Sequence, residues 1–177
     1  QDHNLLTLAE RCTDHLAPGG APSHAPRERL WKVRARQVVL ATGAHERPLV
    51  FANNDLPGVM LASAVTTYIR RYAVLTGQKA VVFTNNDMAY EAAIALHGAG
   101  AQVQVVDARS EVVGDLSARA RELGIKILTG HVVVQADGKG SVASVKVHAH
   151  LPDGRLGPAS APLTCDLLAV SGGFSPV

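Results

Sequence analysis

Hydrophobic residues between positions 79 and 128 alternate between short strand-like runs and longer helical segments. Three short runs predict strands, at residues 79–83, 102–107 and 125–128. The two segments between these runs predict helices, at residues 87–98 and 111–123. A β-α-β-α-β order predicts a parallel sheet with right-handed crossover connections. We therefore expect an α/β chain built on a Rossmann-like parallel sheet with helices.

The pattern after residue 130 changes to strands without intervening helices. Three further strands are expected, at residues 131–135, 144–150 and 163–170. The first two are joined through the turn sequence A-D-G-K-G-S and the last two through P-D-G-R-L-G-P. The final run, C-D-L-L-A-V-S-G-G, predicts a buried strand. We therefore predict an antiparallel β-meander insert, followed by one last strand of the core.

The first 75 residues predict strands and a single helix. Strands are expected at residues 4–14, 29–34 and 37–41. The last of these, Q-V-V-L-A, is a continuous apolar run, which is typical of a strand buried on both faces. Residues 44–58 contain two prolines and form a connecting segment. Apolar residues at helical spacing follow it and predict a helix at 60–75.

Composition excludes several classes of function. Aromatic residues make up only 4% of the chain, which disfavours binding of single-stranded nucleic acid by base stacking. The longest apolar runs are too short to span a bilayer, and no signal peptide is visible. We therefore expect no nucleic-acid partner, no membrane partner and a cytoplasmic location.

The two cysteines, Cys12 and Cys165, lie far apart and form no C-x-x-C pair. This spacing argues against a dithiol redox centre and a zinc site, and favours two buried or half-buried thiols in a reducing cytosol. The sequence begins with Gln1 rather than Met and stops at Val177, just after a Gly-Gly turn. We expect it to be a segment of a longer chain.

The turn after Phe83 is the first candidate for a functional site. A dinucleotide fingerprint, G-x-G-x-x-G, would fall on residues 84–89, between a strand and a helix. Thr84, Asn86 and Ala89 occupy its three glycine positions. Asp107 lies 23 residues after Thr84, close to the expected place of the acid that binds a ribose hydroxyl.

The missing glycines change the interpretation of this turn. The second glycine allows the backbone to approach a pyrophosphate, and the side chain of Asn86 would occupy that room. Asn tolerates left-handed backbone better than most residues, so the turn itself can form. We interpret the segment as a Rossmann-like scaffold whose nucleotide site is degenerate and empty. The alternative is a rearranged loop that binds a nucleotide through the helix N-terminus.

The second candidate is A-T-G-A-H-E-R-P, residues 41–48. Gly43 has no side chain, so a strand that ends there lets the backbone pass close to a cofactor. His45, Glu46 and Arg47 are candidates to bind an anion or a partner subunit, although an exposed loop with a Glu-Arg pair is the alternative.

Other arrangements that could carry chemistry are weaker. His148 and His150 share one face of an expected strand, either as two metal ligands or as an exposed face. No third ligand is placed by spacing, so no metal site is predicted. No catalytic triad or carboxylate pair follows from spacing, and no catalytic residue is assigned.

Four segments in order resemble the alpha subunits of heterotetrameric sarcosine oxidases. They are V-R-A-R-Q-V-V-L-A-T-G-A-H-E-R-P, F-A-N-N-D-L-P-G-V-M-L-A, A-V-V-F-T-N-N-D-M-A-Y and C-D-L-L-A-V-S-G-G-F-S-P-V. The resemblance implies an architecture of two dinucleotide domains, similar to the pyridine nucleotide–disulfide oxidoreductases. Residues 1–58 would then be the end of a truncated first domain with its linker. Residues 59–177 would be an inserted second Rossmann-like domain.

The resemblance also implies cofactors, partners and a reaction. The whole enzyme demethylates sarcosine oxidatively to glycine, formaldehyde and hydrogen peroxide, and contains NAD, FAD and FMN. NAD would bind to the first domain, with Ala41, Thr42 and Gly43 lining the site. The partners would be the beta, gamma and delta subunits, and amine oxidation would belong to the beta subunit. We therefore expect this segment to be inactive alone and to bind no cofactor.

Two other functions stay open at this stage. The chain is a non-catalytic Rossmann-like scaffold that presents surfaces to partners, or it is part of another FAD- or NAD-dependent amine or opine oxidoreductase.

Overall fold

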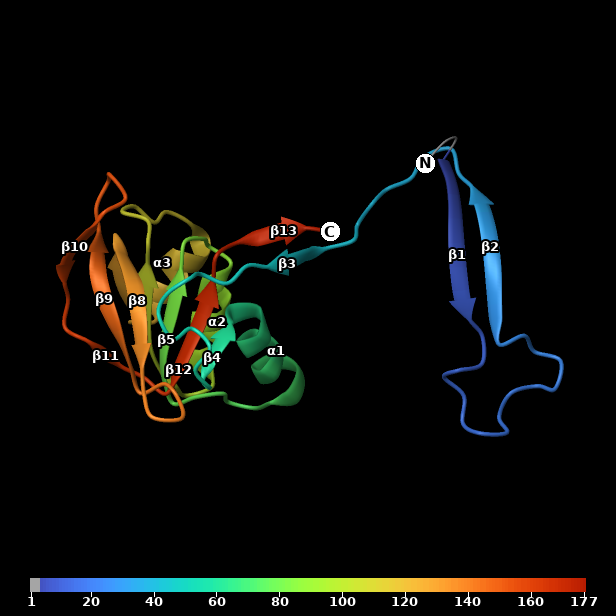
Figure 1. The fold of residues 1–177 in the computed structure, drawn as a ribbon, viewed down its shortest axis with the longest axis horizontal. Helices are drawn as coiled ribbons and strands as arrows, with labels where there is room; N and C mark the ends of the chain where they lie inside the picture. The colour runs from blue at the N-terminus through green and yellow to red at the C-terminus, as the bar shows by residue number, and fades with distance from the viewer. Residues whose placement is uncertain (1–3) are drawn as a thin grey trace. The chain divides into compact units, whose positions relative to one another are not determined.

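The structure, a computed structural model, describes residues 4–177 (Figure 1). These residues form two compact units that divide between Thr42 and Gly43. In the first unit, β1 (Leu5–Arg11) and β2 (Glu28–Arg34) form an antiparallel hairpin in which Leu8 is opposite Trp31. Both of these strands agree with the sequence prediction.

The strand predicted at residues 37–41 is wrong. The segment has no regular secondary structure, and the exposed fractions of Val39 and Leu40 are 88% and 79%. A strand buried on both faces needs a paired strand and a covering layer. Within residues 4–42 the only other strands are β1 and β2, which already pair with each other. The apolar run is therefore not part of a sheet, although Val38 and Leu40 line a hollow together with Leu5 and Leu6 of β1.

The second unit is built around a parallel sheet of five strands. In spatial order these are β4 (Val59–Leu61), β12 (Leu167–Ser171), β5 (Lys79–Thr84), β6 (Gln102–Asp107) and β7 (Lys126–Thr129). β12 is the last strand of this sheet in the chain, yet it lies between β4 and β5. Its five residues are all buried, as expected for a strand covered on both faces.

Helices cover one face of this sheet. They are α1 (Ala62–Tyr72), α2 (Ala89–Gly98) and α3 (Asp115–Glu122) (Figure 1). Alternate strand residues, such as Val82, Val105 and Leu167, join one hydrophobic cluster with residues of the helices. Because side chains of a strand alternate between faces, the residues next to them point to the opposite side.

A small antiparallel sheet covers the opposite face. It contains β8 (His131–Asp137), β9 (Ser144–His150), β10 (Leu156–Ala159) and β11 (Leu163–Thr164). β8 pairs with one edge of β9, and β10 and β11 pair with the other. Val81, Val106 and Leu168 of the parallel sheet share a second hydrophobic cluster with residues of β8 and β9. The predicted Rossmann-like α/β fold with an antiparallel insert is confirmed.

A short ribbon joins the start and the end of the second unit. β3 (Ala44–Glu46) pairs antiparallel with β13 (Phe174–Pro176). Phe51, in the same connecting segment, is buried and contacts the ring of Phe83 edge to face, with ring centroids 6.1 Å apart. Residues 43–58 therefore pack with the second unit, whereas the family resemblance implies a domain boundary at 58/59.

Three further predicted elements differ from those observed. The helix expected at 60–75 is shorter, because residues 59–61 form the edge strand β4 and the helix ends at Tyr72. The helix expected at 111–123 begins only at Asp115. The strand expected at 163–170 is divided into β11 and β12, which belong to different sheets. The Asp166 side chain lies between them and accepts hydrogen bonds from the backbone N–H groups of Gln78 and Lys79, at 3.1 and 2.8 Å. This contact fixes the bend that sends the chain from one sheet to the other.

No helix within residues 4–177 has both the length and the apolar composition that crossing a membrane would require.

The core of the parallel sheet predicts a large effect for Leu168→Ala. Leu168 is fully buried between the two layers, so its loss removes apolar contacts and leaves a cavity that costs about 2–5 kcal/mol. Urea denaturation followed by far-UV circular dichroism measures this change in the free energy of unfolding. Leu156→Ala is the matched control, since Leu156 is 55% exposed. Equal losses in the two variants would contradict the assigned core.

The thiol of Cys165 is expected to be unreactive in the folded chain. Burial raises its pKa to about 11, so roughly one part in a thousand is thiolate at pH 8. Cys12, in contrast, is only partly buried. A thiol-titrating reagent at pH 8 is expected to modify one thiol per folded chain quickly and two after denaturation. Rapid modification of both thiols in the folded chain would contradict the burial of Cys165.

Candidate functional site

A row of buried polar residues marks the carboxyl edge of the parallel sheet. Ser171 at the end of β12 and Asp107 at the end of β6 are each the sheet partner of Thr84, at the end of β5. All three residues are fully buried. Because carboxyl ends of parallel strands form the usual ligand-binding edge of such sheets, this row is the place to test for a nucleotide site.

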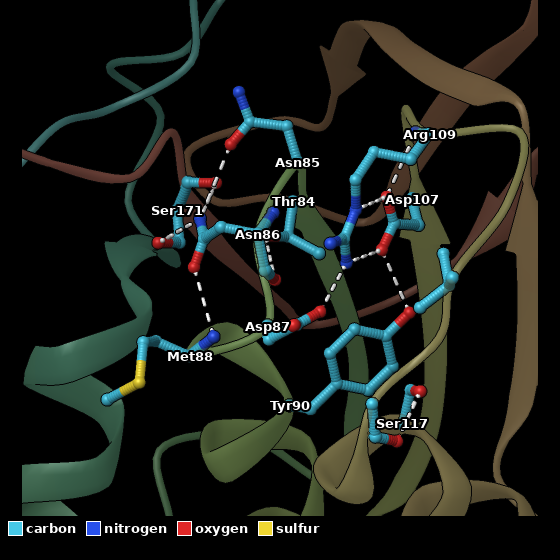
Figure 2. Close-up of polar contacts among 12 residues, drawn as sticks. Thr84, Asn85, Asn86, Asp87, Met88, Tyr90, Asp107, Arg109, Ser117 and Ser171 are labelled. Carbon is cyan, nitrogen blue, oxygen red and sulfur yellow. Dashed lines mark hydrogen bonds and ion pairs between the residues drawn. The ribbon is translucent and has the colours of Figure 1, made fainter.

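The turn between β5 and α2 is a strand–turn–helix elbow, as predicted (Figure 2). The hydroxyl of Thr84 makes two hydrogen bonds with the backbone of Asn86. It accepts the Asn86 N–H at 3.0 Å and donates to the Asn86 carbonyl oxygen at 3.1 Å. Side-chain hydrogen bonds of this kind stabilise tight turns. Thr84 therefore closes the turn locally, where the fingerprint of nucleotide-binding domains has a glycine.

The Asn86 side chain connects three elements at this edge. Its Nδ2 group donates to the backbone carbonyl and the hydroxyl of Ser171, at 3.2 and 3.0 Å. Its Oδ1 atom accepts the backbone N–H of Met88 at 3.1 Å, just before α2 begins. The amide thus takes up one of the N–H groups that would otherwise face an anion at the head of the helix. It also occupies the space that a second fingerprint glycine would leave open.

Asp107 has hydrogen-bond donors from the protein on both carboxylate oxygens. The hydroxyl of Tyr90 donates to Oδ2 at 2.9 Å. Arg109 donates its backbone N–H and its Nε group to Oδ1, at 2.9 and 3.0 Å, and its Nη2 group to Oδ2 at 2.8 Å. A ribose hydroxyl would have to displace at least one of these donors.

Arg109 links this acid to the fingerprint turn. Its Nη2 group also lies 2.8 Å from Oδ1 of Asp87 (Figure 2). The hydrogen bond with Asp107 raises the pKa of Arg109, against the opposing effect of partial burial. Burial, followed by the nearby charge of Asp107, raises the pKa of Tyr90. Two carboxylates and one guanidinium give the cluster a formal charge of −1.

These residues do not fit a dinucleotide diphosphate. The predicted residues Thr84, Asn86, Ala89 and Asp107 do come together at one edge, in the order that the fingerprint requires. Ala89 is buried at the start of α2, which suits close packing of helix and strand. The Asn86 amide, however, fills the approach to the turn, and the cluster beside it carries a negative formal charge.

The other predicted cofactor residues lie at the division between the two units. Ala41 and Thr42 end the first unit, and Gly43 begins the second. Gly43 has a φ of +82°, and a Cβ atom added there would meet no heavy atom within 4 Å. This open, left-handed glycine is compatible with a backbone that passes close to a ligand. The role of Ala41, Thr42 and Gly43 in binding NAD stays a prediction.

Glu46, the acid of the A-H-E-R-P segment, has a structural role. Glu46 accepts the backbone N–H of Ser63 at 2.9 Å, at the start of α1. Leu61 at the N-cap position makes no side-chain capping bond, so the carboxylate of β3 caps the helix instead. Arg47 exchanges backbone hydrogen bonds with Gly172 and Gly173. The Glu-Arg pair of the exposed-loop alternative is not among the ion pairs of residues 4–177.

The two histidines of β9 are held by carbonyl groups. Nδ1 of His148 lies 3.0 Å from the Gly157 carbonyl oxygen, and Nδ1 of His150 lies 3.2 Å from that of Ala108. Across the described part of the chain, no group of three or more His, Cys, Asp or Glu side chains is placed to bind a metal ion. The interpretation of these histidines as two metal ligands therefore lacks a third ligand.

Sequence reasoning missed four residues of the cluster: Asp87, Tyr90, Arg109 and Ser171. Arg109 had a usable signal, because it lies two residues after the candidate acid and an arginine there is able to fold back on it. Ser171 had none, because it is 85 residues away from Asn86 and its contact depends on β12 lying beside β5.

Comparison with known proteins defines the class of this chain. Residues 20–177 match the family model described as pyridine nucleotide-disulphide oxidoreductase, so the chain belongs to that family. Over 99% of its length it is 46% identical to sarcosine oxidase subunit alpha of Corynebacterium sp. (strain P-1) and 37% identical to that of Rhizobium meliloti (strain 1021). The predicted resemblance to these alpha subunits is confirmed. The chain spans 18% and 16% of the length of these relatives.

A solved structure supports the fold independently. Thioredoxin reductase of T. acidophilum superposes with a TM-score of 0.63 at 14% sequence identity, over 84% of this chain and 48% of that one. At this identity the likeness shows the fold alone, which is the Rossmann-like fold of the FAD/NAD(P)-binding reductases.

The buried network predicts that Tyr90→Phe destabilises the chain. The substitution keeps the ring and removes the hydroxyl that donates to the buried Asp107 carboxylate, which costs about 1–3 kcal/mol. Tyr72→Phe serves as the control, since Tyr72 is 57% exposed, and a change within about 0.5 kcal/mol is expected there. Urea denaturation measures both. A Tyr90→Phe variant as stable as the wild type would contradict a structural role of this hydrogen bond.

Proposed function

We propose that this chain is a segment of the alpha subunit of a sarcosine oxidase-like flavoenzyme. The main support is the identity of 37–46% with such subunits along nearly the whole chain. By this proposal the complete protein takes part in oxidative demethylation of sarcosine, a reaction on a CH–NH bond. The partners are the beta, gamma and delta subunits of the assembly, and the cofactors of the whole enzyme are NAD, FAD and FMN.

The second unit serves this enzyme as a dinucleotide-type scaffold that holds no nucleotide of its own. One observation carries this part of the proposal: the Asn86 side chain is hydrogen-bonded to Ser171 and Met88 in the place where the backbone of such domains approaches a pyrophosphate. NAD belongs instead to the first dinucleotide domain, where Ala41, Thr42 and Gly43 line the site.

The segment supplies no group that acts on the amine. The titratable side chains at the edge of the sheet are each held by another protein group: Asp107 by Tyr90 and Arg109, and Asp87 by Arg109. A general acid or base has to reach a proton of its substrate, and these side chains are already committed to one another. The chemistry is therefore assigned to other parts of the enzyme, and the isolated chain is expected to be inactive.

The scaffold alternative differs in one observable respect. If the chain only presents surfaces to partner subunits, nothing in it touches a cofactor, even in the complete assembly. A nucleotide bound beside Gly43 in that assembly would exclude the alternative and support the proposal.

The isolated 177-residue chain is expected to bind no NAD. In isothermal titration calorimetry with NAD up to about 1 mM, no saturable heat is predicted, because the residues of the turn deny room to a diphosphate. The chain is also expected to produce no hydrogen peroxide from sarcosine. Micromolar affinity for NAD that is abolished by Asn86→Trp would overturn the proposal of an empty second site.

A further inference from the structure

We propose that Asp87 and Arg109 are an internal replacement for the nucleotide. In this account the Asp87 carboxylate takes the position of the anion ahead of α2, and Arg109 connects it to Asp107, as a bound nucleotide would connect a turn to its ribose acid. The inference rests on the proposed empty site, and explains why the edge of the sheet keeps its shape without a ligand.

The position of Asp87 suits an internal anion. It lies two residues before α2, in the fingerprint turn itself, and its backbone carbonyl accepts the N–H of Tyr90 in the first turn of the helix. The N-terminus of a helix stabilises negative charge there. Room for the carboxylate is provided by Gly114, because a Cβ atom at that residue would come within 3.2 Å of Asp87 Oδ2.

Arg109 joins the two elements that a dinucleotide would join. Its guanidinium contacts both oxygens of Asp107 at the end of β6 and one oxygen of Asp87 in the turn after β5 (Figure 2). The planar guanidinium, with five N–H donors, is suited to such shared contacts between carboxylates. The Asp107 side chain is fully buried, and a buried carboxylate is costly unless it is paired, so Arg109 is the partner that stabilises it.

The cluster adds an electrostatic barrier to the steric one. Its formal charge is −1, and a diphosphate brought to the same edge would meet two carboxylates whose shared guanidinium is already engaged. Removing the Asn86 side chain alone should therefore fail to open the site. Removing Asp87 as well would bring the cluster to neutrality and free one side of the guanidinium for a phosphate oxygen.

The test compares gain of nucleotide binding in two variants of the full 177-residue chain. ADP-ribose is the probe, because it carries the diphosphate and both riboses, and calorimetry measures its Kd. Asn86→Gly is expected to bind no better than the wild type. Asn86→Gly combined with Asp87→Ser is expected to bind at least about tenfold tighter than Asn86→Gly alone.

A charge-matched control separates this inference from a general effect of charge. Asn86→Gly combined with Glu111→Ser also removes one negative charge, but from an exposed residue of the loop before α3 that has no contact in the cluster. It should bind like Asn86→Gly. If the Glu111 variant gains as much as the Asp87 variant, or if Asn86→Gly alone already reaches the affinity of the double variant, the inference is overturned.

Folding and the proposed function are separated by two further measurements. Thermal melting checks each variant, and if the Asp87→Ser combination does not fold, Asn86→Gly with the isosteric Asp87→Asn is judged by the same tenfold criterion. Micromolar binding of ADP-ribose by the wild type would contradict the proposed function, in which the second site holds no nucleotide. Absence of binding by every variant that folds would contradict only the internal replacement.

Discussion

The hydrogen bonds of the Asn86 amide are the constraint on which this edge of the protein depends. The carboxyl edge of a parallel sheet leaves backbone groups of strands and helix N-termini without partners inside their own elements. Nucleotide-binding relatives of this fold satisfy some of them with a ligand. Here Asn86 ties the end of β12 to the head of α2, and each such bond contributes roughly 0.5–1.5 kcal/mol.

The ion pairs of Arg109 with Asp87 and Asp107 also satisfy polar groups at this edge with protein partners instead of a ligand. Hydrogen bonds between charged groups are stronger than neutral ones, at about 1.5–3 kcal/mol each, and Asp107 is buried enough to be little screened by solvent. Asp87 and Arg109 are partly exposed, so their mutual contact is worth less than the contact with Asp107. The elbow therefore stays in the form typical of nucleotide domains, although its side chains differ from theirs.

The sequence was sufficient to locate strands whose own residues have a clear strand pattern. β5 and β6 are short valine-rich runs next to helical segments, and their type and order followed from the pattern of the chain. The run at residues 37–41 has the same composition but is exposed, since burial depends on neighbours that composition does not reveal. The position of β12 between β4 and β5 was likewise outside the reach of local pattern.

The candidate site was predictable in outline and not in its contacts. The places of Thr84, Asn86 and Asp107 followed from a fixed spacing that the fold imposes on such turns. What each side chain does there depends on partners brought in by topology, above all Ser171, and on the rotamer of Arg109. The fingerprint spacing, even without its glycines, therefore identified the strand–turn–helix element. The hydrogen bonds within it depend on the tertiary structure.

The most direct test of this account is a crystal structure of the chain soaked with millimolar NAD. If the second site is empty as proposed, no nucleotide density is expected at the elbow, and the Asn86 amide remains bound to Ser171 and Arg109 remains between its two carboxylates. Density for a diphosphate within hydrogen-bonding distance of the backbone nitrogens of Asn86 or Met88, with the Asn86 side chain displaced, would contradict it.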